Sequence, residues 1–385
     1  MKSINRVVVL LLVMIVTVKA YGKVEHIIIV PGCLDKTDFE RKYGEKSFES
    51  LDSRKNKIQL IKEDLKSTFK TVNLDSFSLD KSLVKVVSQY THLDYEKIAS
   101  EINLLKEFSE LGIIPDYKDC AYKVELIRKE YRVRYFIIQE KVDRDVYTFF
   151  RERLSRKLKT SEMIYKFLQM AMLIQKLRLL GYTHQDIKPS NFVSTNQKMS
   201  DFRLIDLSFA VPHNSPGIGG TRYFSSPDKR SLKFTATFHQ DAFAFALTLI
   251  KLIDEEGVFD KTIKKECIRH PDTFSDKCKE SFIAGVEALK GKVELKGFFE
   301  YLKDHFFNTE DPLDINDMMA VLINCFKKIN DSIPDNSRDK NYKLIDLVNK
   351  LITEYNENIQ TLNEEVSYKL QEKKESEGTS PNIII

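Results

Sequence analysis

Hydrophobic and polar positions follow strand-like and helix-like periods in the first part of this 385-residue chain. The segment Ile58–Val87 is strand-like, and its end, Leu83–Val87, is rich in β-branched residues. Tyr135–Ile138 is a short apolar run that predicts another buried strand. Between them, Asp94–Phe108 places apolar residues on one face at helical spacing. This part of the chain therefore predicts a small sheet with one helix.

The spacing becomes helical after Asp143. Ile164–Leu180 has apolar residues at nearly helical spacing and is followed by Gly181, a common helix stop. Asp241–Ile253 is apolar almost all round, which predicts a helix in the centre of a lobe. Helical patterns continue to about Tyr355. We therefore expect a larger, mainly helical second lobe.

The start of the chain is typical of a secretory signal. Lys2 and Arg6 precede the apolar run Val7–Val16, and small or modest residues allow cleavage after Ala20. The apolar stretch is shorter than the roughly 20 residues that span a bilayer, so cleavage is favoured over a single-pass anchor. A buried first strand is a third interpretation. Residues 365–380 are charged and poor in apolar residues, which predicts a solvated tail.

Composition narrows the class of protein. The chain is 42% hydrophobic and 31% charged, as in an ordinary globular protein. Its net charge of +4 falls to +1 when the three cations of the first 20 residues are subtracted. The remaining Lys and Arg residues are spread along the chain, so nothing favours a nucleic-acid partner.

The five cysteines permit disulfides if the chain enters an oxidising compartment. Cys267 and Cys278 are close in sequence and are the best candidate pair, with isolated buried thiols as the alternative. The cysteine spacings do not fit a zinc site.

Two short segments concentrate the polar chemistry. His184–Asn191 contains Asp186 and Lys188, and Leu204–Ser208 contains Asp206. Two carboxylates, an amine and the carboxamide of Asn191 thus lie close in sequence between apolar runs. Phosphoryl transfer from a nucleotide needs a group that orients the nucleophile, oxygen ligands for metal ions and a cation for the migrating charge.

These segments resemble the catalytic loop and the metal-binding triplet of eukaryotic protein kinases. The resemblance implies an α+β, two-lobed fold with a small β-rich N-lobe carrying one helix and a larger, mainly α-helical C-lobe. It makes Asp186 the base, Lys188 the residue that neutralises the γ-phosphate, and Asn191 and Asp206 the metal ligands.

Further positions follow from the same resemblance. Lys85 is similar to the lysine that contacts the α- and β-phosphates, and Glu101 to its ion-pair partner. Thr221, in Gly220–Asp228, is expected to bond to the base and its neighbouring lysine, as in the serine/threonine-specific branch. The resemblance places the other nucleotide-binding residues at Glu140 and Val142 of the hinge, and at Leu83, Val72 and Val193.

The same comparison gives two structural expectations. Asp228 stands where the family usually has Glu, and Arg338 resembles its buried ion-pair partner. Asp241 is similar to the residue that braces the catalytic loop.

The chain also departs from the family pattern. The glycine-rich loop has Leu65, Ser67 and Lys70 in place of its three glycines, which should loosen the phosphate cradle. Leu83 replaces the usual alanine beside the adenine. Gln185 replaces the arginine that would grip a phosphorylated activation loop, and Ser208 replaces the last glycine of the metal-binding triplet.

The predicted organisation is a signal peptide at 1–20, an extension at 21–55, an N-lobe at 56–142, a C-lobe at 143–350, and a C-terminal helix with a charged tail at 351–385. The predicted function is transfer of the γ-phosphate of ATP to serine or threonine hydroxyls of proteins. ATP and Mg²⁺ are expected as cofactors, with Mn²⁺ as the alternative metal. The expected location is the secretory-pathway lumen or outside the cell, with no membrane span once the signal is removed. A pseudokinase that acts as a binding or scaffolding module is the alternative, and the substrate and oligomeric state stay open.

Overall fold

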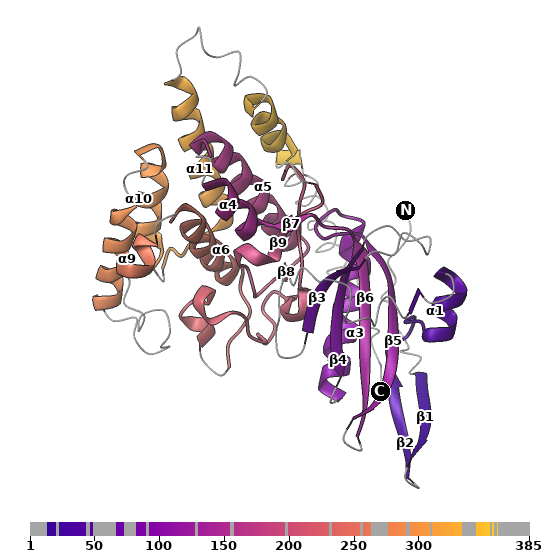
Figure 1. Ribbon diagram of the computed structural model, residues 1–385. Coiled ribbons are helices and arrows are strands. Elements are labelled where there is room, and N and C mark those ends of the chain that lie inside the picture. The colour runs from indigo at the N-terminus through magenta and orange to yellow at the C-terminus, as the bar shows by residue number, and fades with distance from the viewer. Residues whose placement is uncertain are drawn as a thin grey trace, which may run out of the picture. The chain divides into compact units, whose positions relative to one another are not determined.

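The chain forms two compact units in the computed structural model (Figure 1). The first comprises Met1–Phe149 and Pro189–Ala210, and the second comprises Phe150–Lys188 and Val211–Ile385. The structure describes residues 14–20, 23–43, 47–48, 67–72, 82–89, 92–127, 130–154, 158–196, 199–230, 233–254, 257–262, 276–289, 293–308, 310–332, 344–354, 356–357 and 360.

A four-stranded antiparallel sheet organises the first unit, with strand order β3-β4-β6-β5. Helix α3 (His92–Ser109) packs against β4 and β5. Both the helix and β4 match the sequence prediction closely, whereas β5 was not predicted. The strands are β3 (Ser67–Val72), β4 (Ser82–Gln89), β5 (Tyr117–Ile127) and β6 (Glu130–Glu140).

Alternation along β4 gives the sheet two different faces. Lys85 is buried on the face that meets Glu101 of α3. Val84, one position earlier, belongs to an apolar cluster with Phe136 and Ile138 of β6. Residues Phe39 and Phe48, which precede the sheet in sequence, complete this second cluster. The sheet is therefore covered on both faces.

The N-terminal extension is attached to the sheet by several kinds of contact. Its helix α1 (Lys36–Tyr43) carries Phe39, and Leu34 forms a parallel bridge to Ala121 at the edge strand β5. A disulfide joins Cys33 to Cys120 with a Cα–Cα distance of 4.6 Å. The sequence predicted an extension at 21–55 but did not predict this bridge.

The first residues of the described chain form a hairpin. Strand β1 (Met14–Ala20) pairs with β2 (Lys23–Ile29) in antiparallel register. Cleavage after Ala20 would remove one strand of this hairpin. The signal peptide stays a prediction.

Short strands and turns of the first unit position its share of the candidate site residues. The three-stranded sheet β10-β9-β7 belongs wholly to that unit. Helix α4 (Val146–Leu154) spans the boundary between the units. The short elements of the first unit are β7 (Arg144–Asp145), η2 (Pro189–Asn191), β9 (Phe192–Ser194), β10 (Phe202–Leu204) and η3 (Leu207–Phe209).

Helices dominate the described part of the second unit. Helix α5 (Thr160–Leu179) ends just before Gly181, whose φ of 78° lies in the left-handed region that favours glycine. Helix α6 (Phe238–Ile253) is almost entirely buried, as its sequence predicted. The remaining elements are β8 (Tyr182–Thr183), β11 (Val211–Pro212), η4 (Arg222–Phe224), η5 (Asp228–Arg230), α7 (Val258–Thr262), α9 (Asp276–Ala288), η6 (Val293–Leu295), α10 (Lys296–His305), α11 (Ile315–Asp331) and a helical segment at 344–354.

Several sequence predictions concern residues outside the described ranges. These include the strand-like Ile58–Leu60, the substituted glycine position Leu65, the partner residue Arg338 and the tail 365–380. Cys267 also lies outside them, while Cys278 is disulfide-bonded and Cys325 is a free, buried thiol.

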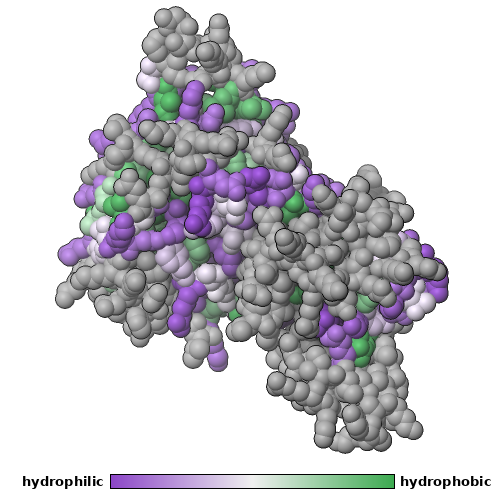
Figure 2. Space-filling view, in the orientation of Figure 1, coloured by the Kyte–Doolittle hydropathy of each residue, from purple (hydrophilic) through white to green (hydrophobic). Residues whose placement is uncertain are grey.

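The described surface is mostly polar. Where Figure 2 colours the surface, hydrophilic residues predominate and apolar ones occur in small scattered groups. Among the residues that the structure describes, no helix is both long and apolar enough to cross a membrane.

Candidate active site

The β9–β10 hairpin sets the positions of Asn191 and Asp206. Asn191 immediately precedes β9, and Asp206 follows β10 after one intervening residue. The backbone N–H of that residue, Ile205, donates to the carbonyl of Asn191 at 2.9 Å. The two ends of the hairpin are thereby held together, with Asn191 and Asp206 both buried.

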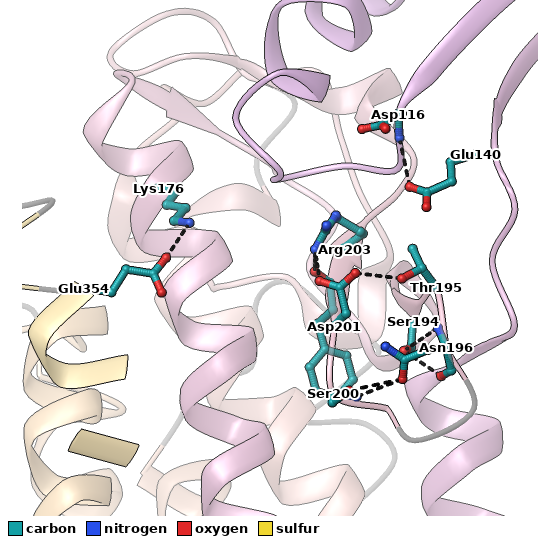
Figure 3. Close-up of polar contacts among 11 residues, drawn as sticks. Asp116, Glu140, Lys176, Ser194, Thr195, Asn196, Ser200, Asp201, Arg203 and Glu354 are labelled. Atoms are coloured by element: carbon teal, nitrogen blue, oxygen red, sulfur yellow. Dashed lines mark hydrogen bonds and ion pairs between the residues drawn. The ribbon is translucent and has the colours of Figure 1, made fainter. Parts of the chain in front are cut away.

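Polar contacts stabilise the other end of this hairpin, as Figure 3 shows. Thr195 Oγ1 donates to Asp201 Oδ2 at 2.7 Å, and Arg203 forms an ion pair with the same carboxylate. Ser200 donates through both its backbone N–H and its hydroxyl to Asn196 Oδ1, each at 3.3 Å. This side of the hairpin therefore has its own polar support.

The carboxylate of Asp206 has a defined orientation. The backbone of Asp206 is in the left-handed region with φ 69°, which is uncommon for a residue with a side chain. Its Oδ1 accepts hydrogen bonds from Lys85 Nζ at 2.9 Å and from Ser208 Oγ at 2.7 Å. The serine that replaces the family's glycine thus contacts the carboxylate directly.

Lys85 joins Asp206 to helix α3. Its Nζ lies 2.5 Å from Glu101 Oε1, and all three side chains are buried. Burial opposes the positive charge, but the carboxylates of Asp206 and Glu101 outweigh it and raise the pKa of Lys85 above its usual 10.5. The lysine therefore stays an ammonium group, able to bind phosphate oxygens.

The predicted hinge follows the end of β6. The Glu140 backbone N–H donates to the Asp116 carbonyl at 2.7 Å, and its side chain accepts from the Asp116 N–H (Figure 3). Val142 forms a buried apolar cluster with Val193 and Ile205. An apolar cluster beside a hinge is a suitable surface for a flat aromatic base.

Two other predicted nucleotide-binding residues, Val72 and Leu83, are placed by their backbones alone. Leu83 pairs with Thr71 on one side and with Gln139 on the other, and Val72 pairs with Ser82. Val72 therefore ends the edge strand β3, and Leu83 lies near the start of β4, the strand that carries Lys85.

In the second unit, Asp186 forms a compact group with Lys188 and Thr221. Lys188 Nζ donates to Asp186 Oδ2 and to Thr221 Oγ1, both at 2.6 Å. The Thr221 backbone N–H donates to Asp186 Oδ1 at 2.7 Å. The contacts that the resemblance implied for Thr221 are thus present, and both oxygens of the Asp186 carboxylate are oriented.

Asp241 supports the loop that carries Asp186. Its Oδ2 and Oδ1 accept from the backbone N–H groups of His184 at 2.6 Å and Gln185 at 2.8 Å. Burial raises the pKa of this carboxyl, although contacts with His184 and nearby Lys229 act in the opposite direction. The expected bracing contact is therefore present.

Two contributors to this loop were missed from the sequence. Lys229 donates to the Gln185 carbonyl, and Gln240 Oε1 accepts from Gln185 Nε2 at 3.0 Å. Gln240 is a polar residue next to Asp241 at the start of a mainly apolar helix, and this position was the signal that the sequence offered. Nothing in the sequence around Lys229 indicated its role, apart from its position directly after Asp228.

The predicted pair of Asp228 with Arg338 cannot be described, because Arg338 lies outside the described residues. Asp228 Oδ2 accepts a hydrogen bond from Gln240 Nε2 at 2.6 Å. Asp228 itself is exposed.

The residues of the first unit fit a divalent cation by their chemistry. Asp206 supplies carboxylate oxygens and Asn191 a carboxamide oxygen, the ligand atoms that Mg²⁺ prefers. A carboxylate has about four lone-pair sites on its two oxygens, so the bonds from Lys85 and Ser208 to Asp206 Oδ1 are compatible with a bound cation. Among the described residues, no group of three or more His, Cys, Asp or Glu side chains could hold a metal alone. Phosphate oxygens and water would complete the coordination.

Comparison with known proteins agrees with the geometry. The family model of the protein kinase domain matches residues 76–358, well over half of the chain. No curated protein matched the sequence. The family match confirms the predicted α+β, two-lobed fold.

Proposed function

Because the chain belongs to the protein kinase family, which uses ATP, a divalent metal and protein substrates, we propose that it is an active serine/threonine kinase of the secretory pathway or the extracellular space. The observation that carries the proposal is the buried contact of Lys85 with both Glu101 and Asp206. This contact keeps a cation beside the carboxylate that would hold the metal. Burial of this charged group costs desolvation energy, and charged groups with strongly perturbed surroundings cluster at functional sites.

Each polar group has a specific task in this proposal. Lys85 binds the α- and β-phosphates, and Asp206 and Asn191 hold the metal, expected to be Mg²⁺. When bound, the cation neutralises charge on the phosphate oxygens. Glu140 and Val142 meet the adenine through the hinge backbone, and Val193 packs beneath it. The first unit alone supplies this entire set.

Asp186 and its neighbours act on the protein substrate. Thr221 and Lys188 orient the Asp186 carboxylate, which accepts or orients the proton of the attacking hydroxyl. Lys188 also supplies positive charge for the migrating phosphoryl group. The contact between Lys188 and Thr221 supports serine/threonine rather than tyrosine specificity.

A location in the secretory pathway is supported by two independent features. The first residues are typical of a signal peptide, and the Cys33–Cys120 disulfide suits an oxidising compartment. Expression in a secreting host followed by N-terminal sequencing tests this part. The expected mature chain begins at Tyr21, and retention of Met1 in the exported or membrane-bound protein contradicts cleavage.

The substituted glycine-rich loop favours a second candidate, a pseudokinase scaffold. Strand β3 carries Ser67 and Lys70 where the family has glycines, and side chains there should weaken phosphate binding. Thermal denaturation with millimolar ATP and Mg²⁺ distinguishes the two candidates. Stabilisation that Asp206→Asn abolishes supports the enzyme, while no shift supports the scaffold. Asp304→Asn, at an exposed position of α10, is the matched control.

A further inference from the structure

The backbone of Gln185, directly before Asp186, is in an unfavourable conformation. Its φ of 67° lies in the left-handed region, which costs a residue with a side chain roughly 1–2 kcal/mol. Such a conformation persists only where the surroundings enforce it. The carbonyl of Gln185 shares a peptide group with the Asp186 nitrogen, so any contact that fixes this carbonyl also fixes the start of the Asp186 residue.

Lys229 makes that contact. Its ammonium group donates to the Gln185 carbonyl, while Asp241 Oδ1 accepts from the Gln185 N–H. The peptide groups on both sides of Gln185 are therefore anchored by buried charged side chains. Among the described residues, no carboxylate lies within ion-pair distance of Lys229 Nζ.

The burial of Lys229 has an electrostatic cost. Desolvation lowers its pKa to about 8, opposed by the more distant carboxylates of Asp241, Asp186 and Asp228, while Lys188 lowers it further. A cation buried without an ion pair does not stabilise the fold efficiently, which points to a functional reason for its position.

Gly220 leaves room for this contact. A Cβ atom there would lie 2.3 Å from the Gln185 carbonyl oxygen and 2.6 Å from Lys229 Nζ. The residue that follows is Thr221, whose N–H binds Asp186. Gly220 and Thr221 therefore act together: Thr221 orients the Asp186 carboxylate, and Gly220 leaves space for the Lys229 ammonium group.

Gln240 forms a second connection to the same loop. Its Oε1 accepts from Gln185 Nε2 at 3.0 Å, and its Nε2 donates to Asp228 Oδ2 at 2.6 Å and to the Thr235 carbonyl at 2.9 Å. Both glutamines are buried. A chain of neutral amides thus links Gln185 to Asp228, the neighbour of Lys229.

We propose that Lys229 and Gln240 are positioning residues that hold the Gln185–Asp186 peptide in its strained conformation and couple Asp228, at the end of the segment Gly220–Asp228, to the base. The inference rests on the proposed function, because it takes Asp186 as the base. The family resemblance assigns no role to Lys229 or Gln240, and this inference gives each of them one.

The test compares Lys229→Met with Lys279→Met, a control at an exposed position of α9. Misplacement of a reacting group by about 1 Å can cost on the order of a hundredfold in rate. We therefore expect Lys229→Met to lower kcat by roughly tenfold to a hundredfold with KM for ATP within about twofold of wild type. A kcat equal to that of the control overturns the proposal, as does an equal loss in kcat and in ATP affinity.

A second variant covers the case in which Lys229→Met does not fold. Gln240→Leu removes the amide link and leaves Lys229 in place, and it should also lower kcat without changing KM for ATP. Unchanged kcat in this variant contradicts the proposal.

Hydrogen exchange separates this inference from the proposed function. If the wild-type protein transfers no phosphate, the proposed function fails, and the positioning role is then decided by amide exchange in residues 183–188. Lys229→Met should speed this exchange by at least about tenfold relative to Lys279→Met. The loss of one hydrogen bond of ordinary strength lowers the free energy of local opening by about the amount that gives a tenfold faster exchange. Equal exchange in the two variants overturns the inference.

Discussion

The ammonium group of Lys85 is enclosed by two carboxylates, and its surroundings leave it little freedom. Glu101 and Asp206 each lie within hydrogen-bonding distance, and all three residues are at most 3% exposed. A buried pair of this kind contributes less to net stability than its short distances suggest, because desolvation opposes it. Loss of one partner is costly, however, because it leaves uncompensated buried charge.

Lys85→Met should therefore destabilise the fold by about 3–5 kcal/mol, since it leaves two carboxylates buried without their cation. Urea unfolding measures the change. Lys97→Met, at an exposed position of the same helix that carries Glu101, is the control and should lie within about 0.5 kcal/mol of wild type. Equal stability of the two variants would show that the Lys85 contacts are not formed in solution.

Lys229 predicts a pH dependence of stability with a definite sign. Its folded-state pKa of about 8 lies below the unfolded value of 10.5, so below pH 8 both states are protonated and the burial penalty is fully present. Between pH 8 and 10.5 the unfolded state binds more protons, so the free energy of unfolding rises with pH. Lys229→Met removes this term.

The difference in unfolding free energy between wild type and Lys229→Met should thus shift by on the order of 3 kcal/mol in favour of wild type from pH 7.5 to 10.5. Titrations shared by both proteins cancel in this difference. A difference that stays constant over this range would place the lysine in water rather than in the interior.

Leu83 predicts a change in nucleotide affinity. It stands in β4 where the family usually has alanine, and extra side-chain volume against the adenine costs about 1–3 kcal/mol. Leu83→Ala should tighten ATP binding by roughly tenfold to a hundredfold, as measured by calorimetry. Leu83→Val, which removes less volume, should give a smaller gain. Unchanged affinity in both variants would show that the side chain turns away from the nucleotide.

At the scale of elements, the sequence predicted what depends on local periodicity. Helices α3, α5 and α6 and strand β4 agree with the predicted segments, because their apolar residues repeat at helical or strand spacing. Strand β5 was missed. Its charged residues interrupt the apolar pattern by which a strand is predicted. It is an edge strand, and its outer edge pairs with Leu34, which is distant in sequence.

The N-terminal extension was also predicted only in outline, for a related reason. Helix α1 has a single buried apolar residue, Phe39, so its sequence gives a weak helical signal. Contacts with Phe136 and Ile138 and the Cys33–Cys120 bridge fix it in place. Such long-range contacts leave no local pattern, so the spacing of the cysteines did not indicate this bridge.

Removal of the Cys33–Cys120 disulfide should expose the contribution of this extension. Disulfides typically stabilise by about 2–4 kcal/mol, so Cys33→Ser/Cys120→Ser should lower the free energy of unfolding by this amount. The measurement is urea unfolding under non-reducing conditions. Reductant should destabilise wild type more than the double variant, and an equal effect would show that the bridge does not form.

At the scale of the whole molecule, the predicted two-lobed fold is confirmed by the family match, and the predicted site residues lie in two groups of side-chain contacts. Lys85, Glu101 and Asp206 come from separate elements, yet the structure places them in contact within the first unit. Asp186, Lys188 and Thr221 form a second group within the other unit. The spacing of the motifs was sufficient to predict the members of these two groups. The contacts of Lys229 and Gln240 with Gln185 depend on tertiary packing, which no motif describes.

Phosphate transfer by the purified mature chain tests the central claim most directly. With radiolabelled ATP, Mg²⁺ and a mixture of protein substrates, wild type and Asp304→Asn should label serine and threonine residues. Asp186→Asn should reduce turnover by at least roughly a hundredfold, the contribution of general base catalysis, while ATP still stabilises the protein. Wild-type turnover in Asp186→Asn, or no transfer by the wild type, would contradict the account.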